Sequence, residues 1–379
     1  MSGPRISAGW LADPGLQAAM ALLAGAGHQA LIVGGAVRDG LLGLPVRDVD
    51  LATDAPPDRV LALAEAAGVR AVPTGFDHGT VTLVFGGRAI EVTTFRRDVE
   101  TNGRHARVSF STDVAEDAAR RDFTLNALYA DGGGHVIDPL GALPDLRAGH
   151  VRFVGTPADR IREDHLRILR FFRFTAWYGR PELGPDAEGL AASAAFSAGI
   201  ETLSRERVGH EMRRLLAAAD PAPTVASMAA SGVLARALPG ADARALAPLV
   251  HLEAGLAPDP VRRLAALGGA DAAADLRLTR AEAKRLTALR EATGGAGELG
   301  YRLGAEAARD ALLVRAAATG GDLPSGWQAD VERGAVARFP IRAADLQPLA
   351  GPELGQALAE REARWIASGF RLSREQLLT

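Results

Sequence analysis

The first part of the chain alternates short β-type runs with helical stretches. Apolar residues fill the run ALIVGG, and they alternate with polar ones in RDVDLAT and in TVTLVFGGRAIEVTTFR, as strands do. Within the last run, Gly86 and Gly87 separate two alternating segments and predict a β-hairpin. From Pro157 onward apolar residues recur at helical spacing almost to the last residue. The pattern predicts the α+β class, with an α/β head followed by an all-α region.

Composition narrows the class of protein. The 379 residues are 47% hydrophobic and 23% charged, with a net charge of −3, which is typical of a globular protein. No stretch is long and apolar enough to cross a bilayer, so no membrane partner is expected. The absence of cysteine excludes disulfides and thiolate metal sites, and it favours a cytoplasmic location. Lys284 is the only lysine, which excludes a Walker-type phosphate loop.

Candidate chemistry begins with two aspartates separated by one residue. On a strand, Asp48 and Asp50 would point to the same face and could bind the same ions. Hard carboxylate oxygens suit Mg²⁺, which takes one or two protein carboxylates together with substrate phosphates. A solvated turn is the alternative. Glu91, flanked by Ile90 and Val92 in AIEVTTF, is either a third ligand for two-metal chemistry or an exposed residue of an alternating strand.

Two glycines precede these aspartates. Gly34 and Gly35 end an apolar strand and open a helix, so backbone N–H groups at the helix start can receive a phosphate. Arg38 lies one turn into that helix and can reach the same anion with its planar guanidinium. Combined with the two aspartates, this arrangement describes a nucleoside triphosphate held beside a pair of metal ions.

Three separated motifs resemble those of a known family, the class II tRNA nucleotidyltransferases and bacterial poly(A) polymerases of the DNA polymerase β-like nucleotidyltransferase superfamily. GGAVRDGLLG with RDVDLAT resembles the first motif, RRDFTLNAL at 120–128 the second, and REDHLRILRFFRF at 162–174 the nucleotide-selecting motif. The resemblance extends over residues 28–180. It implies a catalytic head with a mixed β-sheet and helices at 1–155, a helical neck at 156–215, a helical body at 216–300 and a helical, tRNA-binding tail at 301–379.

The second motif would then hold the substrate. The resemblance implies that Arg121 holds the triphosphate or ribose, that Asp122 buttresses Arg121, and that Asn126 lies one turn further along the same helix. An ordinary helix start, with Asp122 as a local cap, is the alternative.

The third motif carries a polar row on an apolar helix. The row recurs every third residue and consists of Asp164, Arg167, Arg170 and Arg173. A helix this apolar is mostly buried, and buried arginines need anionic or hydrogen-bonding partners. The resemblance implies that Asp164 and Arg167 read the Watson–Crick edge of CTP or ATP, while Arg170 and Arg173 support them or reach phosphate. A salt-bridge ladder between head and neck is the alternative.

Four arginines and an Asn-Gly pair between Glu91 and Arg120 suggest a mobile basic loop beside the site. They are Arg96, Arg97, Arg104, Arg107 and Asn102-Gly103. The resemblance implies a loop that helps to switch from C to A addition. The sequence VETNGRH lacks the tyrosine expected there, and His105 is as compatible with a surface role as with a catalytic one.

The resemblance implies template-independent addition of CCA to the 3′ end of tRNA from CTP and ATP, with two Mg²⁺ ions. A poly(A) polymerase is expected to carry a basic tail, whereas residues 301–379 hold ten basic and ten acidic residues. A split-function enzyme that adds only A or only C, and an inactive RNA-binding protein, remain alternatives. A dinucleotide-binding turn is disfavoured because its third glycine and acidic ribose ligand are misplaced. None of the eight histidines precedes an aspartate, so no HD phosphohydrolase domain is expected.

Overall fold

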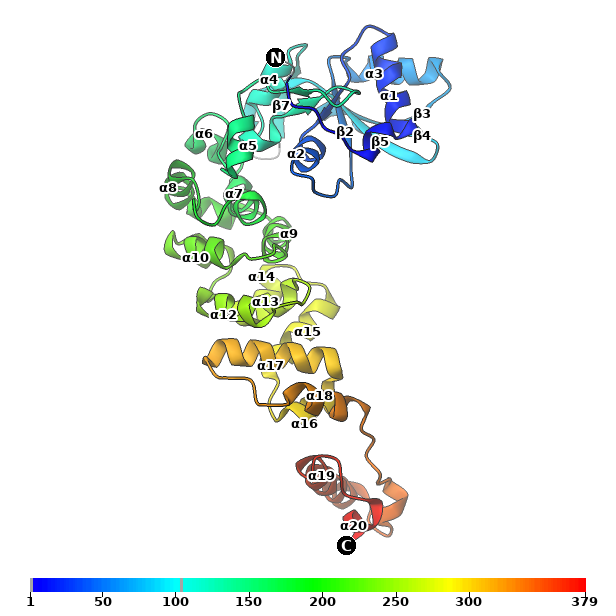
Figure 1. The fold of residues 1–379 in the computed structure, drawn as a ribbon, viewed down its shortest axis with the longest axis vertical. Coiled ribbons are helices and arrows are strands. Elements are labelled where there is room, and N and C mark those ends of the chain that lie inside the picture. The colour runs from blue at the N-terminus through cyan, green and yellow to red at the C-terminus, as the bar shows by residue number, and fades with distance from the viewer. Residues whose placement is uncertain (1–2, 103–104) are drawn as a thin grey trace. The chain divides into compact units, whose positions relative to one another are not determined.

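The computed structural model describes residues 3–102 and 105–379, with side chains for all of these except 98–102 and 105–108. The chain divides into two compact units. The first comprises Met1–Leu203 with Ala230–Arg236, and the second comprises Ser204–Ala229 with Ala237–Thr379. The first unit holds the β-sheet, and the second is built from helices (Figure 1).

A seven-stranded sheet organises the first unit, in the order β3-β4-β5-β2-β1-β8-β9. β2 pairs in parallel with β5, while the other neighbouring pairs are antiparallel. The mixed sheet implied by the resemblance is therefore confirmed. Its strands are β1 (Leu31–Val33), β2 (Asp50–Thr53), β3 (Arg70–Gly75), β4 (Thr80–Phe85), β5 (Arg88–Thr94), β8 (Tyr129–Ala130) and β9 (Val136–Ile137).

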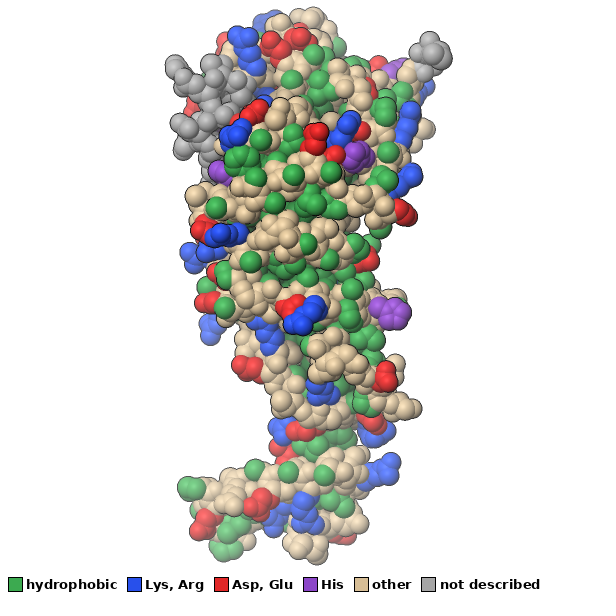
Figure 2. Space-filling view, turned by 90° about the vertical axis from the view of Figure 1, so that its left-hand side faces the viewer, with side chains coloured by type: hydrophobic (Ala, Val, Ile, Leu, Met, Phe, Trp, Pro, Cys, Tyr) green, Lys and Arg blue, Asp and Glu red, His purple; other side chains and the backbone are tan. Residues whose placement is uncertain are grey.

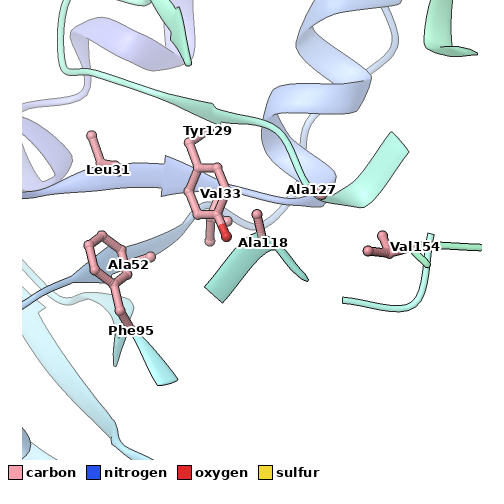
Figure 3. Close-up of a cluster of buried hydrophobic side chains, with 8 residues drawn as sticks. All are labelled: Leu31, Val33, Ala52, Phe95, Ala118, Ala127, Tyr129 and Val154. Atoms are coloured by element: carbon pink, nitrogen blue, oxygen red, sulfur yellow. The ribbon is translucent and has the colours of Figure 1, made fainter. Parts of the chain in front are cut away.

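Helices and buried side chains hold this sheet in place. Helix α1 (Pro14–Gly25) begins where the Asp13 carboxylate accepts a hydrogen bond from the Leu16 N–H at 2.9 Å, and α1 and α3 (Pro57–Ala66) pack against β4. A buried apolar cluster joins strands β1, β2 and β8 to helix α4 (Val114–Ala119) (Figure 3). Its members are Leu31, Val33, Ala52, Phe95, Ala118, Ala127, Tyr129 and Val154.

The predicted hairpin between β4 and β5 is confirmed. Phe85 pairs with Arg88, so Gly86 and Gly87 form a two-residue connection. Their φ angles of +57° and +84° are left-handed, as the turns that match the twist of paired strands require.

The segment predicted as a mobile basic loop is a two-stranded β-ribbon, so that prediction is wrong about the backbone. β6 (Arg96–Asn102) pairs antiparallel with β7 (His105–Phe110), and Asn102 pairs with His105. An Asn-Gly pair between two runs of alternating residues is itself a hairpin signal, which the loop prediction overlooked. Arg104 lies outside the described residues, as do the side chains of His105 and Arg107.

Helices account for the rest of the described chain outside loops and short strands. The first unit also contains α2 (Gly35–Leu41), α5 (Leu143–Ala148), α6 (Pro157–Glu163), α7 (Leu166–Tyr178), α8 (Ala187–Ala195) and most of α11 (Val233–Ala237). The second contains α9 (Arg205–Leu216), α10 (Ala222–Ala230), α12 (Leu246–Leu252), α13 (Pro260–Leu267), α14 (Ala272–Asp275), α15 (Arg280–Glu291), α16 (Ala296–Leu303), α17 (Ala305–Thr319), α18 (Trp327–Val336), α19 (Gly351–Ala367) and α20 (Arg374–Leu378). The division of this helical part into neck, body and tail stays a prediction.

A buried ion cluster lies between helices α12, α13 and α17 of the second unit. Arg262 donates to Glu253 at 2.6 Å and to Asp310 at 3.0 Å, and Arg263 donates to Glu253 at 2.9 Å. All four side chains are at most 3% exposed. Each buried charge therefore has an opposite partner, as burial demands.

The surface shows no concentration of one charge on the face drawn in Figure 2, where basic and acidic side chains are interspersed. Among the described residues, no helix is long and apolar enough to cross a membrane.

Candidate active site

The predicted turn from strand to helix is present at the first motif. Gly34 follows β1 and caps α2, with φ +67° and ψ −120°, a conformation that favours glycine. A Cβ atom at this position would stand 3.5 Å from Nη1 of Arg121. The glycine thus brings the backbone close to an arginine of the second motif. The role of Gly34 and Gly35 in holding phosphate stays a prediction.

The two aspartates share one face, but only one of them lies on a strand. β2 begins at Asp50, so the expectation that Asp48 is a strand residue is wrong. The chain is nevertheless extended enough for Val49 to be buried while both aspartates are exposed. Leu51 pairs with Val92 in the parallel β2–β5 ladder. The preceding residues, Asp50 and Glu91, are consequently neighbours across the two strands.

Electrostatics connects these three acids with an arginine. Although Asp50 as a whole residue is exposed, neighbouring protein atoms displace part of the water around its carboxylate. This desolvation, together with the carboxylates of Glu91 and Asp48, raises the pKa of Asp50, and Arg121 opposes the shift. A carboxylate repelled by two others favours a bound cation. Among residues 3–102 and 105–379, however, no three acidic or histidine side chains stand close enough to form a preformed metal-ligand group. Metal binding by Asp48, Asp50 and Glu91 therefore stays a prediction.

Arg121 is held by two residues that the sequence analysis missed. It donates from Nη2 to Asp117 at 2.9 Å and from Nε to the Tyr129 hydroxyl at 3.0 Å. The expectation that Asp122 buttresses Arg121 is thus wrong, because Asp117 makes that contact. Asp117 precedes Arg121 by four residues in a helical stretch, a spacing that favours an ion pair and could have predicted this contact. No local pattern in the sequence predicts the contact with Tyr129.

Asp122 instead ties the second motif to the third. It accepts a hydrogen bond from Nε of Arg170 at 2.7 Å and one from the Asn126 amide at 2.9 Å. Burial alone would raise the pKa of Asp122, but Arg170 and Asn126 hold it below its usual value. Asn126 ends a short 3₁₀ turn, Thr124–Asn126, that is separate from α4, so the single continuous helix expected here is wrong.

Arg38 is buried inside the protein, with a side chain 8% exposed. It donates to Asp39 at 2.8 Å, to Asn126 at 2.6 Å and to the Tyr178 hydroxyl at 2.7 Å. Its guanidinium also lies 4.0 Å from the centre of the Tyr178 ring. In this structure Arg38 thus joins α2 to the second motif and to α7, and its predicted contact with phosphate stays a prediction.

The third motif is interrupted where the sequence predicts a continuous helix. α6 ends at Glu163 and α7 begins at Leu166, whose N–H donates to the Asp164 carboxylate at 3.1 Å. Asp164 is therefore a cap between two helices, because aspartate competes for backbone N–H groups more readily than it extends a helix. The arginines that follow do share α7.

Those arginines differ in their surroundings. Arg167 donates to the Arg160 carbonyl at 3.0 Å and pairs with Glu163, a partner four residues earlier that the sequence analysis missed. Arg170 pairs with Asp122. Arg173 is 3% exposed and lies 4.3 Å from the centre of the Phe174 ring. The salt bridge from Arg170 fits the ladder alternative, and base selection by Asp164 and Arg167 stays a prediction.

Comparisons with known proteins find relatives of the segment that holds the first two motifs. Residues 30–152 match the family described as the poly A polymerase head domain, and residues 185–244 match a probable RNA- and SrmB-binding site of polymerase A. The mitochondrial CCA tRNA nucleotidyltransferase 1 of Mus musculus is 43% identical over 206 residues, which are 53% of this chain and 47% of that protein. The CCA-adding enzyme of Geobacillus thermodenitrificans is 41% identical over 216 residues, or 56% and 52% of the two chains.

Solved structures extend the likeness beyond the head, although the chain spans only about half the length of these curated relatives. The Bacillus stearothermophilus CCA-adding enzyme, solved in complex with CTP, is 29% identical with a TM-score of 0.68 over 94% of each chain. The Thermotoga maritima CCA-adding enzyme complexed with tRNA shares the fold at 18% identity, with a TM-score of 0.70 over 100% of this chain and 98% of that one. On these matches, residues 30–152 are similar to the head domain of poly(A) polymerases, and the chain as a whole resembles the CCA-adding enzymes in fold.

Proposed function

We propose that this protein adds CCA to the 3′ end of tRNA, without a template, from CTP and ATP and with release of pyrophosphate. The observation that carries the proposal is the place of Asp50, which neighbours Glu91 across β2 and β5 and is acted on by the charges of Asp48, Glu91 and Arg121. Arg121 in turn faces the Gly34 turn. The Arg121 guanidinium and the helix start at Gly34 suit the phosphates of a nucleoside triphosphate, and the carboxylates suit its metal counter-ions.

The choice of substrates is supported by what the relatives are named for. The curated relatives are named as CCA-adding enzymes, and the structure 29% identical to this chain holds CTP. Neighbours of the same fold were solved with ATP and with tRNA. The match at residues 185–244 to a probable RNA-binding segment is consistent with an RNA acceptor.

The donor set fits Mg²⁺. Asp48 and Asp50 would hold it, with Glu91 as a candidate third ligand, because Mg²⁺ prefers carboxylate oxygens and the Asp50 carboxylate is repelled by its neighbours. When bound, a pair of Mg²⁺ ions lowers the pKa of the attacking 3′-hydroxyl and neutralises charge on the triphosphate.

The protein's own residues would then supply position and fixed charge. Arg121 directs Nη1 toward Gly34, where it can take a phosphate oxygen. Asp164 and Arg167, both partly exposed at the start of α7, would read the base. Arg170 would keep α7 against the second motif through Asp122. A cytoplasmic location, expected from the cysteine-free sequence, is part of the proposal.

The proposal is tested with three tRNA transcripts, ending before CCA, after C and after CC. Each is incubated with CTP, ATP or both in the presence of Mg²⁺, and the 3′ ends are sequenced. Completion to CCA followed by arrest is expected. Long A tracts would identify a poly(A) polymerase, and addition of one type of nucleotide would identify a split-function enzyme. No addition to any transcript would leave the inactive RNA-binding protein.

A further inference from the structure

Arg121, Asp117 and Tyr129 form a closed ring of hydrogen bonds, and the sequence analysis assigned no role to Asp117 or Tyr129. Arg121 donates to Asp117 and to Tyr129, and the Tyr129 hydroxyl itself donates to the same Asp117 oxygen at 2.7 Å. Asp117 is 1% exposed and Tyr129 is fully buried. Tyr129 belongs to the apolar cluster of Figure 3, which also contains Ala118 from the helix of Asp117. The ring is therefore packed against a buried apolar cluster, and this packing restricts the movement of its side chains.

The carboxylate of Asp117 remains charged in this ring. Burial alone would raise its pKa, but Arg121, Arg120 and the Tyr129 hydroxyl lower it to about 2. Its second oxygen accepts a hydrogen bond from Nε of Arg120 at 2.8 Å. A buried anion with fixed donors on both oxygens is a rigid anchor for a guanidinium.

The anchor leaves one end of Arg121 directed at the candidate site. Nε and Nη2 face the ring, while Nη1 stands 3.5 Å from the place that a Gly34 Cβ would occupy. The same guanidinium acts electrostatically on Asp50. The positive charge of Arg121 therefore lies between the Gly34 turn and Asp50.

We propose that Asp117, together with the Tyr129 hydroxyl, is a positioning residue that holds the Arg121 guanidinium so that Nη1 binds the triphosphate of the incoming nucleotide. The inference rests on the proposed function, since it assigns a nucleoside triphosphate to that site. Preorganised charge favours binding because the side chain does not have to be ordered when the ligand arrives.

The test compares the affinities of the full chain for CTP and for CMP, measured calorimetrically with Mg²⁺. CMP lacks the two outer phosphates, so a defect in positioning Arg121 affects CTP selectively. We expect Asp117→Asn and Tyr129→Phe each to weaken CTP binding by about tenfold and CMP binding by less than twofold. Tyr129→Phe retains the buried carboxylate, so it keeps the test valid if Asp117→Asn fails to fold.

Two further variants separate positioning from general damage. Arg120→Gln removes the donor to the other Asp117 oxygen but keeps the contacts of Arg121 with Asp117 and Tyr129, so it should change the CTP-to-CMP affinity ratio less than Tyr129→Phe does. In an Arg121→Ala background, Tyr129→Phe should cause no further loss of CTP affinity.

The inference is overturned if Tyr129→Phe binds CTP as tightly as the wild type does, or if this variant weakens CTP and CMP binding equally. It is also overturned if Tyr129→Phe still weakens CTP binding in the Arg121→Ala background. The same holds if Arg120→Gln changes the CTP-to-CMP affinity ratio as strongly as Tyr129→Phe does. These results are distinguishable from failure of the proposed function, which would appear as a wild-type protein that extends no tRNA transcript.

Discussion

At the scale of single residues, direct contacts with neighbouring side chains position the residues of the candidate site. Gly34 has a left-handed φ and stands against Arg121, and Arg38 is surrounded by Asp39, Asn126 and Tyr178. The strand–turn–helix around Gly34 could be predicted from an apolar run that ends in two glycines. The burial of Arg38 could not, because Tyr178 is 140 residues away in the chain.

Replacing Gly34 should destabilise the protein and disturb Arg121. Gly34→Ala puts a residue with a Cβ in an unfavourable backbone conformation, so we expect a loss of about 1–3 kcal/mol in the free energy of unfolding. The added Cβ would lie in van der Waals contact with Nη1, at 3.5 Å, and would fill space proposed for a phosphate, so we also expect weaker CTP binding. Gly43→Ala is the matched control, since Gly43 shares a φ of +67° but has open space around its Cβ position. Urea unfolding and CTP titration check both. Equal CTP affinity in the two variants would contradict the proximity argument.

The buried Asp117 predicts a specific response to acid. Its pKa is lowered to about 2 from an ordinary value of 3.8, so the folded state binds this proton less readily than the unfolded state. The resulting stabilisation, about 2 kcal/mol, is complete above about pH 4 and is lost as the pH falls through about 2. Urea unfolding of the wild type and Asp117→Asn between pH 2 and 6 measures it. Parallel stability curves for the two proteins would contradict the assignment.

At the scale of elements, the contact between the second motif and α7 joins residues 48 positions apart. The helical character of residues 157–178 follows from their apolar periodicity, but the break at Asp164 does not, because a three-residue polar spacing continues smoothly across it. The pairing of Asp122 with Arg170 was equally inaccessible, since the motif pattern assigns Asp122 to Arg121.

The pair of Asp122 and Arg170 should show energetic coupling. We expect Asp122→Asn and Arg170→Ala each to cost about 2 kcal/mol of unfolding free energy, because each removes a charge-assisted hydrogen bond from a partly buried site. The double variant should lose about 1–2 kcal/mol less than the sum. An Asp159–Arg162 cycle serves as the control, as both of those side chains are mostly exposed. Strict additivity at Asp122 and Arg170 would refute the pairing.

At the scale of the whole molecule, the α+β head and the helical remainder are both recognisable in the sequence, since periods of two and of 3.6 residues differ clearly. The buried ion cluster of the second unit, by contrast, is not recognisable in the sequence. Arg262 and Glu253 are nine residues apart across a turn, and Asp310 comes from α17. Charged residues in a helical pattern are predicted at the surface, so their burial emerges only when the helices pack.

Breaking this cluster should destabilise the second unit. Arg262→Leu leaves Glu253 and Asp310 buried without one of their partners, and we expect a loss of about 3–5 kcal/mol in unfolding free energy. The control is Arg244→Leu, whose pair with Asp242 is at the surface and should contribute nothing measurable. Chemical denaturation of both variants decides, and equal stabilities would contradict a structural role for the cluster.

The most direct test of the account is the rate of nucleotide transfer by Asp50→Ala, measured beside its affinity for tRNA. With a tRNA that ends before CCA, CTP, ATP and Mg²⁺, the wild type should complete CCA, while the variant should transfer no nucleotide and bind the tRNA with affinity within about threefold of the wild type. Transfer at the wild-type rate by Asp50→Ala would contradict the assignment of the reaction to this group of carboxylates.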